Sequence, residues 1–159
     1  MTILDSTIES LATRFDPNSS AMNDEDIDAF ESELKQLIPK SFLSFIKRAN
    51  GLSIEFEGHP YIDLYPLIDQ NKKSSVPSIL DLGRKNLDMV NSDHLLEIGV
   101  EYGRGDVLAL QCSSADQPRH LDSSIYWIQI DNFGNKVLCD QHFSQFLVKL
   151  NRWDGQSDL

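Results

Sequence analysis

Residues Gly103 to Asp106 bring two glycines, a guanidinium and a carboxylate into four consecutive positions. This composition fits an adhesion-type Arg-Gly-Asp ligand, a phosphate-binding loop or a corner between two strands. A phosphate loop requires a lysine and a hydroxyl after its glycines, whereas here Asp106 and Val107 follow, and the added carboxylate would repel phosphate. We therefore expect Gly103, Gly105 and Asp106 to form a tight turn between two strands, because glycine tolerates the backbone angles of such turns.

Histidine and cysteine could serve a metal site or a nucleophile. The four histidines are scattered, with no H-x-x-x-H spacing, and Cys112 and Cys139 form no C-x-x-C pair. No G-x-S-x-G motif marks a nucleophilic serine. The sequence thus predicts no catalytic residue, no metal and no cofactor, and both cysteines are expected to be reduced and buried. A hydrolase built on a chance pair of carboxylates stays open as the least favoured alternative.

Charge is the clearest asymmetry of the chain, whose net charge is -11. Residues 1–34 hold nine acidic side chains and one arginine, a net charge of -8. Such a field repels nucleic acid and anionic membranes, and it attracts a basic protein surface. It is also compatible with a purely solvated helix face. As candidate partner-binding residues we take the carboxylates and tyrosines expected to be exposed: Asp24, Glu25, Asp28, Glu31, Glu55, Glu57, Tyr61 and Tyr65.

Three helices are expected before the first strand. Ser6 and Glu9 match a capping box, which predicts a helix over residues 6–15. Asn23 is a suitable cap for a second, acidic helix with an apolar stripe from Ile27 to Ile38. A third helix follows Pro39 and is expected to end at Asn50 and Gly51, residue types that tolerate a left-handed backbone.

Alternating apolar residues then predict strands at 52–56, 61–65, 95–100, 107–111, 125–130 and 136–139. A helix is expected at 78–90 and an amphipathic helix at 143–153. Hairpin-length connections favour an α+β fold, with a mostly antiparallel, bent sheet and helices packed against it. We expect one domain over residues 1–153, a frayed tail at 154–159, and a cytoplasmic protein without a membrane span.

The order of several motifs resembles the SUKH superfamily, which includes fungal regulators of cell-wall synthesis and many bacterial immunity proteins. The resemblance covers about residues 24–150 and rests on motifs that occur in this order along the chain: Phe30-Glu31, Leu37-Ile38-Pro39, Phe42 with Phe45, Asn50-Gly51, Leu64-Tyr65-Pro66-Leu67, Gly103 to Asp106, Ile125 to Ile130, and Phe143 to Leu150. It implies helices against a bent sheet and a non-catalytic binding domain. It also assigns the glycines at 103 and 105 to a strand corner.

Together with the acidic charge of residues 1–34, the resemblance implies an immunity protein that neutralises a basic-surfaced bacterial toxin by stoichiometric binding. A regulatory or scaffold domain that binds a cellular protein is the alternative. Three segments depart from the family pattern: the first helix, the loop around Lys72 and Lys73, and the connection from Ser113 to Ser124. Such insertions often carry specificity.

Overall fold

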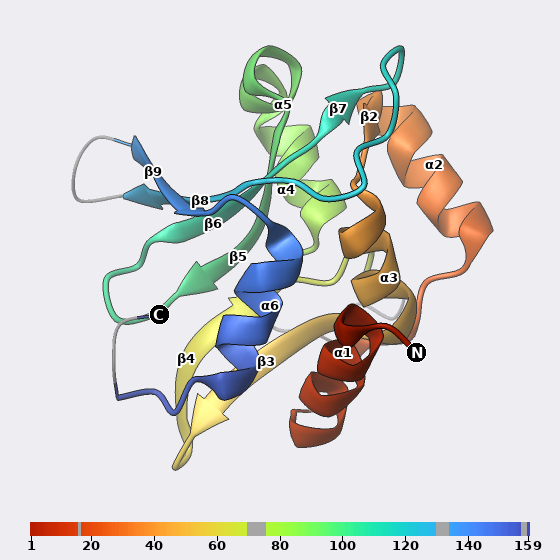
Figure 1. Ribbon diagram of the computed structural model, residues 1–159. Coiled ribbons are helices and arrows are strands. Elements are labelled where there is room, and N and C mark those ends of the chain that lie inside the picture. The colour runs from red at the N-terminus through yellow and green to blue at the C-terminus, as the bar shows by residue number, and fades with distance from the viewer. Residues whose placement is uncertain (16, 70–75, 130–133, 157–158) are drawn as a thin grey trace.

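A computed structural model describes residues 1–15, 17–69, 76–129, 134–156 and 159 (Figure 1). Its helices are α1 (Ile3–Arg14), α2 (Asp24–Leu34), α3 (Lys40–Arg48), α4 (Ile79–Lys85), α5 (Leu87–Asp93) and α6 (Phe143–Arg152). Its strands are β1 (Pro17–Ser19), β2 (Gln36–Leu37), β3 (Asn50–Phe56), β4 (His59–Leu64), β5 (Leu95–Glu101), β6 (Val107–Gln111), β7 (Ser113–Ser114), β8 (Ile125–Gln129) and β9 (Asn135–Asp140). The fold is α+β, as the sequence predicts.

The main sheet has the order β1-β3-β4-β5-β6-β8-β9, and every neighbouring pair is antiparallel. The six predicted strands are all present. Register shifts occur at Ile54/Glu55, at Glu97/Gly99 and at Ile125/Tyr126. Irregularities of this kind bend and twist a strand, which gives the curved sheet that the sequence predicts.

The core lies between the sheet and the helices in front of it. Figure 1 shows α6 crossing the sheet, with α1 beside α6. The rings of Phe42 and Phe45 on α3 lie 5.1 and 5.9 Å from Phe143 at the start of α6, with steeply inclined planes. Aromatic pairs favour such inclined geometry over flat stacking. These rings pack with buried residues of the central strands, such as Ile62 and Leu108.

The first two helices have different ends from those expected. The capping box of α1 is formed by Thr2 and Asp5, so the helix begins at Ile3 rather than at residue 6. Asn23 caps α2 as predicted, its side chain accepting a hydrogen bond from the N–H of Asp26. However, α2 ends at Leu34, because Lys35 adopts a left-handed backbone with φ of 54°. The chain beyond Lys35 continues as the short strand β2.

The expected left-handed cap at Asn50 is wrong. Helix α3 ends at Arg48, and only Gly51 of the pair has a positive φ, 87°. Asn50 starts β3 and is fully buried. Its side-chain amide donates to the carbonyls of Ser20 and Ile68, and its side-chain oxygen accepts from the N–H of Leu67. Asn50 thus satisfies three backbone groups that strand pairing leaves open.

The helix expected at 78–90 is two helices, α4 and α5, which meet at Asn86. Gly83 allows α4 to approach α2 closely, since a Cβ there would lie 2.8 Å from a methyl group of Leu34. The loop around Lys72 and Lys73 lies outside the described residues. The short strands β1, β2 and β7 were not expected from the sequence.

The segment after α6 lies against the body of the protein over its described residues. A Cβ at Gly155 would lie 2.6 Å from the ring of Phe56, and the side chain of Leu159 packs against the core.

Candidate functional site

The Gly103–Asp106 segment is a strand corner, as expected. It joins β5 to β6, with Gly105 at φ of 76°. The backbone N–H of Glu101 donates to the carbonyl of Asp106 (2.9 Å), and the N–H of Gly105 donates to the carbonyl of Glu101 (3.0 Å). The carboxylate of Glu101 accepts from the backbone N–H groups of Gly103 and Arg104. These bonds occupy the backbone donors that a phosphate loop would present to its ligand.

A cavity of about 510 Å³, which we call the corner cavity, opens beside this turn. Its apolar walls are formed by Ile62, Trp127, Val137, Trp153 and Leu159. The rest of its lining consists of Glu101, Gly103, Arg104, Asp106 and Gln129. Apolar cavities with a few polar groups are the usual form of binding sites. The corner cavity has no signature in the sequence, because strand pairing and the chain that follows α6 bring its walls together.

The acidic helix presents part of its charge to solvent. Asp24, Glu25 and Asp28 are exposed on α2, and we call these three residues the acidic face. Asp24 pairs with Lys47 of α3 at 2.9 Å, although its side chain stays 83% exposed. Positions four apart lie on one side of a helix, so Asp24 and Asp28 point in a common direction, with Glu25 beside them.

Bases from later in the chain neutralise part of the N-terminal charge. Arg48 binds the carboxylate of Glu9 at 2.7 and 2.9 Å. Arg84 binds Glu33 through two nitrogens, at 2.5 and 2.7 Å. Hydrogen bonds to these arginines lower the pKa values of both carboxyl groups. The negative field around residues 1–34 is therefore weaker than the local charge count implies.

Glu31 does not belong to the acidic face, contrary to the expectation that it is exposed. It is 6% exposed and faces inward from α2. Its carboxylate accepts from both terminal nitrogens of Arg119, at 2.6 and 2.8 Å, and from the N–H of Ile38 at 2.8 Å. Arg119 also donates to the carbonyl of Ile38. Glu31 thus anchors the 113–124 connection to the helical side of the fold.

The carboxylates expected on the first strand are not continuous with the acidic face. Glu55 and Glu57 are exposed near the β3–β4 turn, where Glu57 has a left-handed backbone. Figure 1 shows this turn far from α2, at the lower end of the molecule. Two separate groups of carboxylates therefore replace the single surface that the sequence suggested.

The two candidate tyrosines lie in different environments. Tyr61 is half-buried, with its ring 5.3 Å from Phe56 and 5.5 Å from Trp153. Tyr65 is buried, and burial raises the pKa of its hydroxyl, with a further increase from the nearby Glu97. Tyr61 is thus partly accessible to a partner, whereas Tyr65 packs inside the fold.

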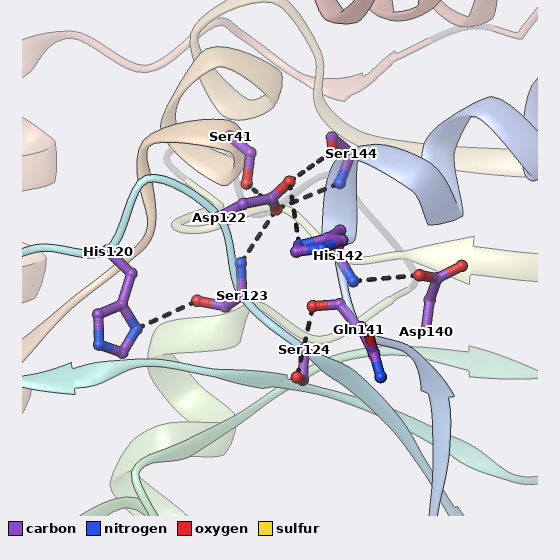
Figure 2. A network of polar contacts seen from close by, with 9 residues as sticks. All are labelled: Ser41, His120, Asp122, Ser123, Ser124, Asp140, Gln141, His142 and Ser144. Carbon is purple, nitrogen blue, oxygen red and sulfur yellow. Dashed lines mark hydrogen bonds and ion pairs between the residues drawn. The ribbon is translucent and has the colours of Figure 1, made fainter.

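A network of serine, histidine and aspartate side chains connects α3 with α6 (Figure 2). The carboxylate of Asp122 accepts from the Ser41 hydroxyl at 2.7 Å, from the hydroxyl and N–H of Ser144, and from the N–H of Ser123. His142 lies 4.0 Å from the same carboxylate. In a hydrolase triad the histidine stands between serine and aspartate, whereas here both serines donate directly to Asp122. The arrangement is that of a helix cap rather than of an activated nucleophile.

The remaining chemistry of the described residues is limited. Cys112 is buried and Cys139 half-buried, and both are free thiols. Burial raises the pKa of Cys139 to about 12 and raises that of Cys112 as well, so both stay protonated at neutral pH. Within the described ranges, no three histidine, cysteine or acidic side chains are placed to share a metal ion. None of the helices in those ranges has the length and apolarity to span a bilayer.

These features define a class: an α+β binding domain with a curved antiparallel sheet, surface carboxylates and an open cavity. The family model of the SMI1/KNR4 family (SUKH-1) matches residues 21–149, so the chain belongs to that family. The family is generally non-catalytic, and its domains are protein-interaction modules. The search of curated proteins found no match.

Proposed function

We propose that this protein is an immunity protein that neutralises a bacterial toxin domain by stoichiometric binding. The observation that carries the proposal is the exposed acidic face on a domain of the SUKH-1 family. Glu25 and Asp28 make no hydrogen bond or close ion pair with the described residues, although the charge of Asp28 helps to raise the pKa of Arg119. Both carboxylates are exposed and can meet a basic surface.

Toxins that act on nucleic acids carry basic clefts that bind phosphates. Carboxylates of the acidic face take the place of those phosphates and thereby block the substrate site. Long-range attraction between the two charged surfaces also accelerates the encounter, and this acceleration falls with ionic strength. The domain needs no chemistry of its own for such a mechanism.

The test begins with capture of the tagged protein's partner from its native host, followed by reconstitution of the purified pair. We expect a one-to-one complex in which the toxin activity is abolished, and protection of cells that express the toxin together with this chain. A complex that retains full toxin activity would overturn the proposal. A captured cellular protein without toxic activity would favour the regulatory alternative.

Two matched double variants test the role of the acidic face. Glu25→Gln with Asp28→Asn removes two charges from α2, whereas Glu55→Gln with Glu57→Gln removes two charges from the distant β3–β4 region. We expect the α2 variant to associate roughly tenfold more slowly at low salt, and the control to change little. Equal association rates for both variants, or a wild-type rate that ignores ionic strength, would exclude electrostatic docking through α2.

A further inference from the structure

The corner cavity is built by residues that the sheet register brings to one side. Ile62 pairs with Glu101, and Trp127 lies between Leu108 and Val137 across β6, β8 and β9. Trp153, directly after α6, closes another side. The sequence contains only two tryptophans, so both indole rings of the protein line this one cavity. Indole faces attract cations and cover alkyl chains.

One carboxylate in the cavity has no assigned role. Asp106 lines the cavity and is only 6% exposed. Its backbone carbonyl accepts from Glu101, but its carboxylate has no hydrogen-bond or ionic partner in the described part of the chain. Among the described residues only the hydroxyl of Ser19 is a buried side-chain polar atom without a partner, so the carboxylate oxygens of Asp106 keep contact with the open cavity, where an opposite charge can meet them. The carboxylate of Glu101, by contrast, is occupied by the backbone N–H groups of Gly103 and Arg104.

We infer that the corner cavity receives one lysine or arginine side chain of the protein partner, with Asp106 as its counter-ion and the two indole rings around its stem. This inference rests on the proposed function, since a partner with a basic surface supplies such side chains. A volume of about 510 Å³ accommodates one long side chain and the backbone that carries it.

Arg104 also lines the cavity and supplies an internal check. Its side chain is exposed, and its guanidinium has no ionic partner among the described residues. A cation at the same opening repels an incoming lysine or arginine. Removing the charge of Arg104 should therefore strengthen binding, whereas removing that of Asp106 should weaken it.

The test titrates the protein with Nα-acetyl-arginine methylamide and Nα-acetyl-lysine methylamide, using tryptophan fluorescence and the indole N–H signals in NMR. The uncharged analogue Nα-acetyl-citrulline methylamide is the control ligand. We expect saturable binding of the two cations in roughly the millimolar range, as for about a dozen buried ligand atoms, and much weaker binding of citrulline.

Asp106→Asn keeps the shape of the side chain and should weaken cation binding at least about tenfold, whereas Arg104→Gln should strengthen it severalfold. Asp93→Asn, an exposed carboxylate on α5, changes the net charge equally and should have no effect. Equal binding of citrulline and arginine, no saturable binding by the wild-type protein, or the same affinity in all variants would overturn the inference.

Failure of the cavity inference can be distinguished from failure of the proposed immunity function. If Asp106→Asn binds and neutralises the toxin as the wild-type protein does, the cavity inference fails and the immunity function stands. If the cavity binds the cationic probes but no toxin is neutralised, the immunity function fails instead.

Discussion

Glu31 and Glu33 stand two positions apart on α2, and each is paired with an arginine far away in the sequence. The environments of the two pairs differ. Glu31 is buried and also accepts from a backbone N–H, whereas both partners of the Glu33–Arg84 pair are about half exposed. Exposed ion pairs contribute little to stability, but breaking a buried one leaves an uncompensated charge inside the protein.

Replacement of Glu31 by glutamine should therefore lower the free energy of unfolding by about 2–3 kcal/mol, because Arg119 keeps its charge and loses its partner. Arg119 is a quarter exposed, which keeps the loss below that of a fully buried pair. Urea denaturation followed by circular dichroism measures the change. Glu33→Gln is the control and should change stability little, and an equal loss in both variants would contradict a structural role specific to Glu31.

At the scale of secondary structure, the connection between β7 and β8 forms hydrogen bonds with three helices, α2, α3 and α6. Arg119 holds α2, and the carbonyls of His120 and Leu121 accept from the first N–H groups of α3. Asp122 accepts from Ser144 in the first turn of α6, whose own N-cap residue, His142, makes no side-chain cap bond. Helix N-termini carry unsatisfied donors that an acceptor must meet. The departure from the family pattern at Ser113–Ser124 thus has a structural explanation.

Asp122→Ala should destabilise the protein by about 2 kcal/mol, since α6 loses its cap and Ser41 and Ser144 lose their acceptor. Thermal unfolding followed by circular dichroism would report it as a lower Tm. Asp116→Ala lies in the same connection at an exposed position and serves as the comparison. A similar Tm for both variants would show that Asp122 does not hold the two helices.

Asp140 couples β9 to α6 in a pH-dependent way. Partial burial alone would raise the pKa of Asp140, but hydrogen bonds from Lys149 (2.6 Å) and from the N–H of His142 (3.1 Å) outweigh it and hold the pKa below its usual value. Because the pKa is lower in the folded state, the stabilisation is present above the unfolded pKa of about 3.9 and disappears as the pH falls through the folded pKa.

Asp140→Asn should accordingly cost about 1 kcal/mol at pH 7 and progressively less below about pH 4. Urea denaturation of both proteins across this pH range provides the measurement. A difference that stays constant from pH 7 into the acidic range would show that the charge of Asp140 does not stabilise the fold.

At the scale of the whole molecule, α1 precedes the residues that the family model matches, yet it is part of the core. Leu11 is completely buried, and Arg14 donates to the backbone carbonyl of Asn151 at the end of α6. We propose that residues 1–153 fold as one cooperative unit in which α1 is an integral element.

Leu11→Ala should therefore destabilise the entire domain by about 2–4 kcal/mol, the usual cost of a leucine-sized cavity. Tryptophan fluorescence reports on the corner cavity, and far-ultraviolet circular dichroism reports on the helices. The urea midpoints of unfolding measured by the two signals should fall by the same amount. Ile3→Ala, at a position 81% exposed, is the control. Separate transitions for the two signals would mean that α1 unfolds independently of the sheet.

Local patterns predict the elements of this fold well. Apolar patterns predict all six longer strands, and the glycines at positions 103 and 105 predict the β5–β6 corner. Both signals depend on residues that are near neighbours in sequence. The strands β1, β2 and β7 are two or three residues long and exist only through distant pairing, such as Leu37 with Ser113. No periodicity develops over so short a length.

The site residues were less predictable for the same reason. Glu31 looks like its exposed neighbours in sequence, and its partner Arg119 is 88 residues away. Asn50 has the composition of a helix cap, but the backbone groups that it binds belong to other loops. Trp127 and Trp153 meet only after the sheet and α6 have assembled around the corner cavity.

The contact between α1 and α6 has a consequence for biosynthesis. Ser10 and Asn151 are hydrogen-bonded although 141 residues separate them. At translation rates of about 5–20 residues per second, roughly 7–30 s pass between the emergence of these two segments from the ribosome. During that interval the first helix can contact α3, as in the Glu9–Arg48 pair, but it lacks the part of its docking site that α6 provides, so a nascent-chain chaperone that shields it would improve the yield of folded protein.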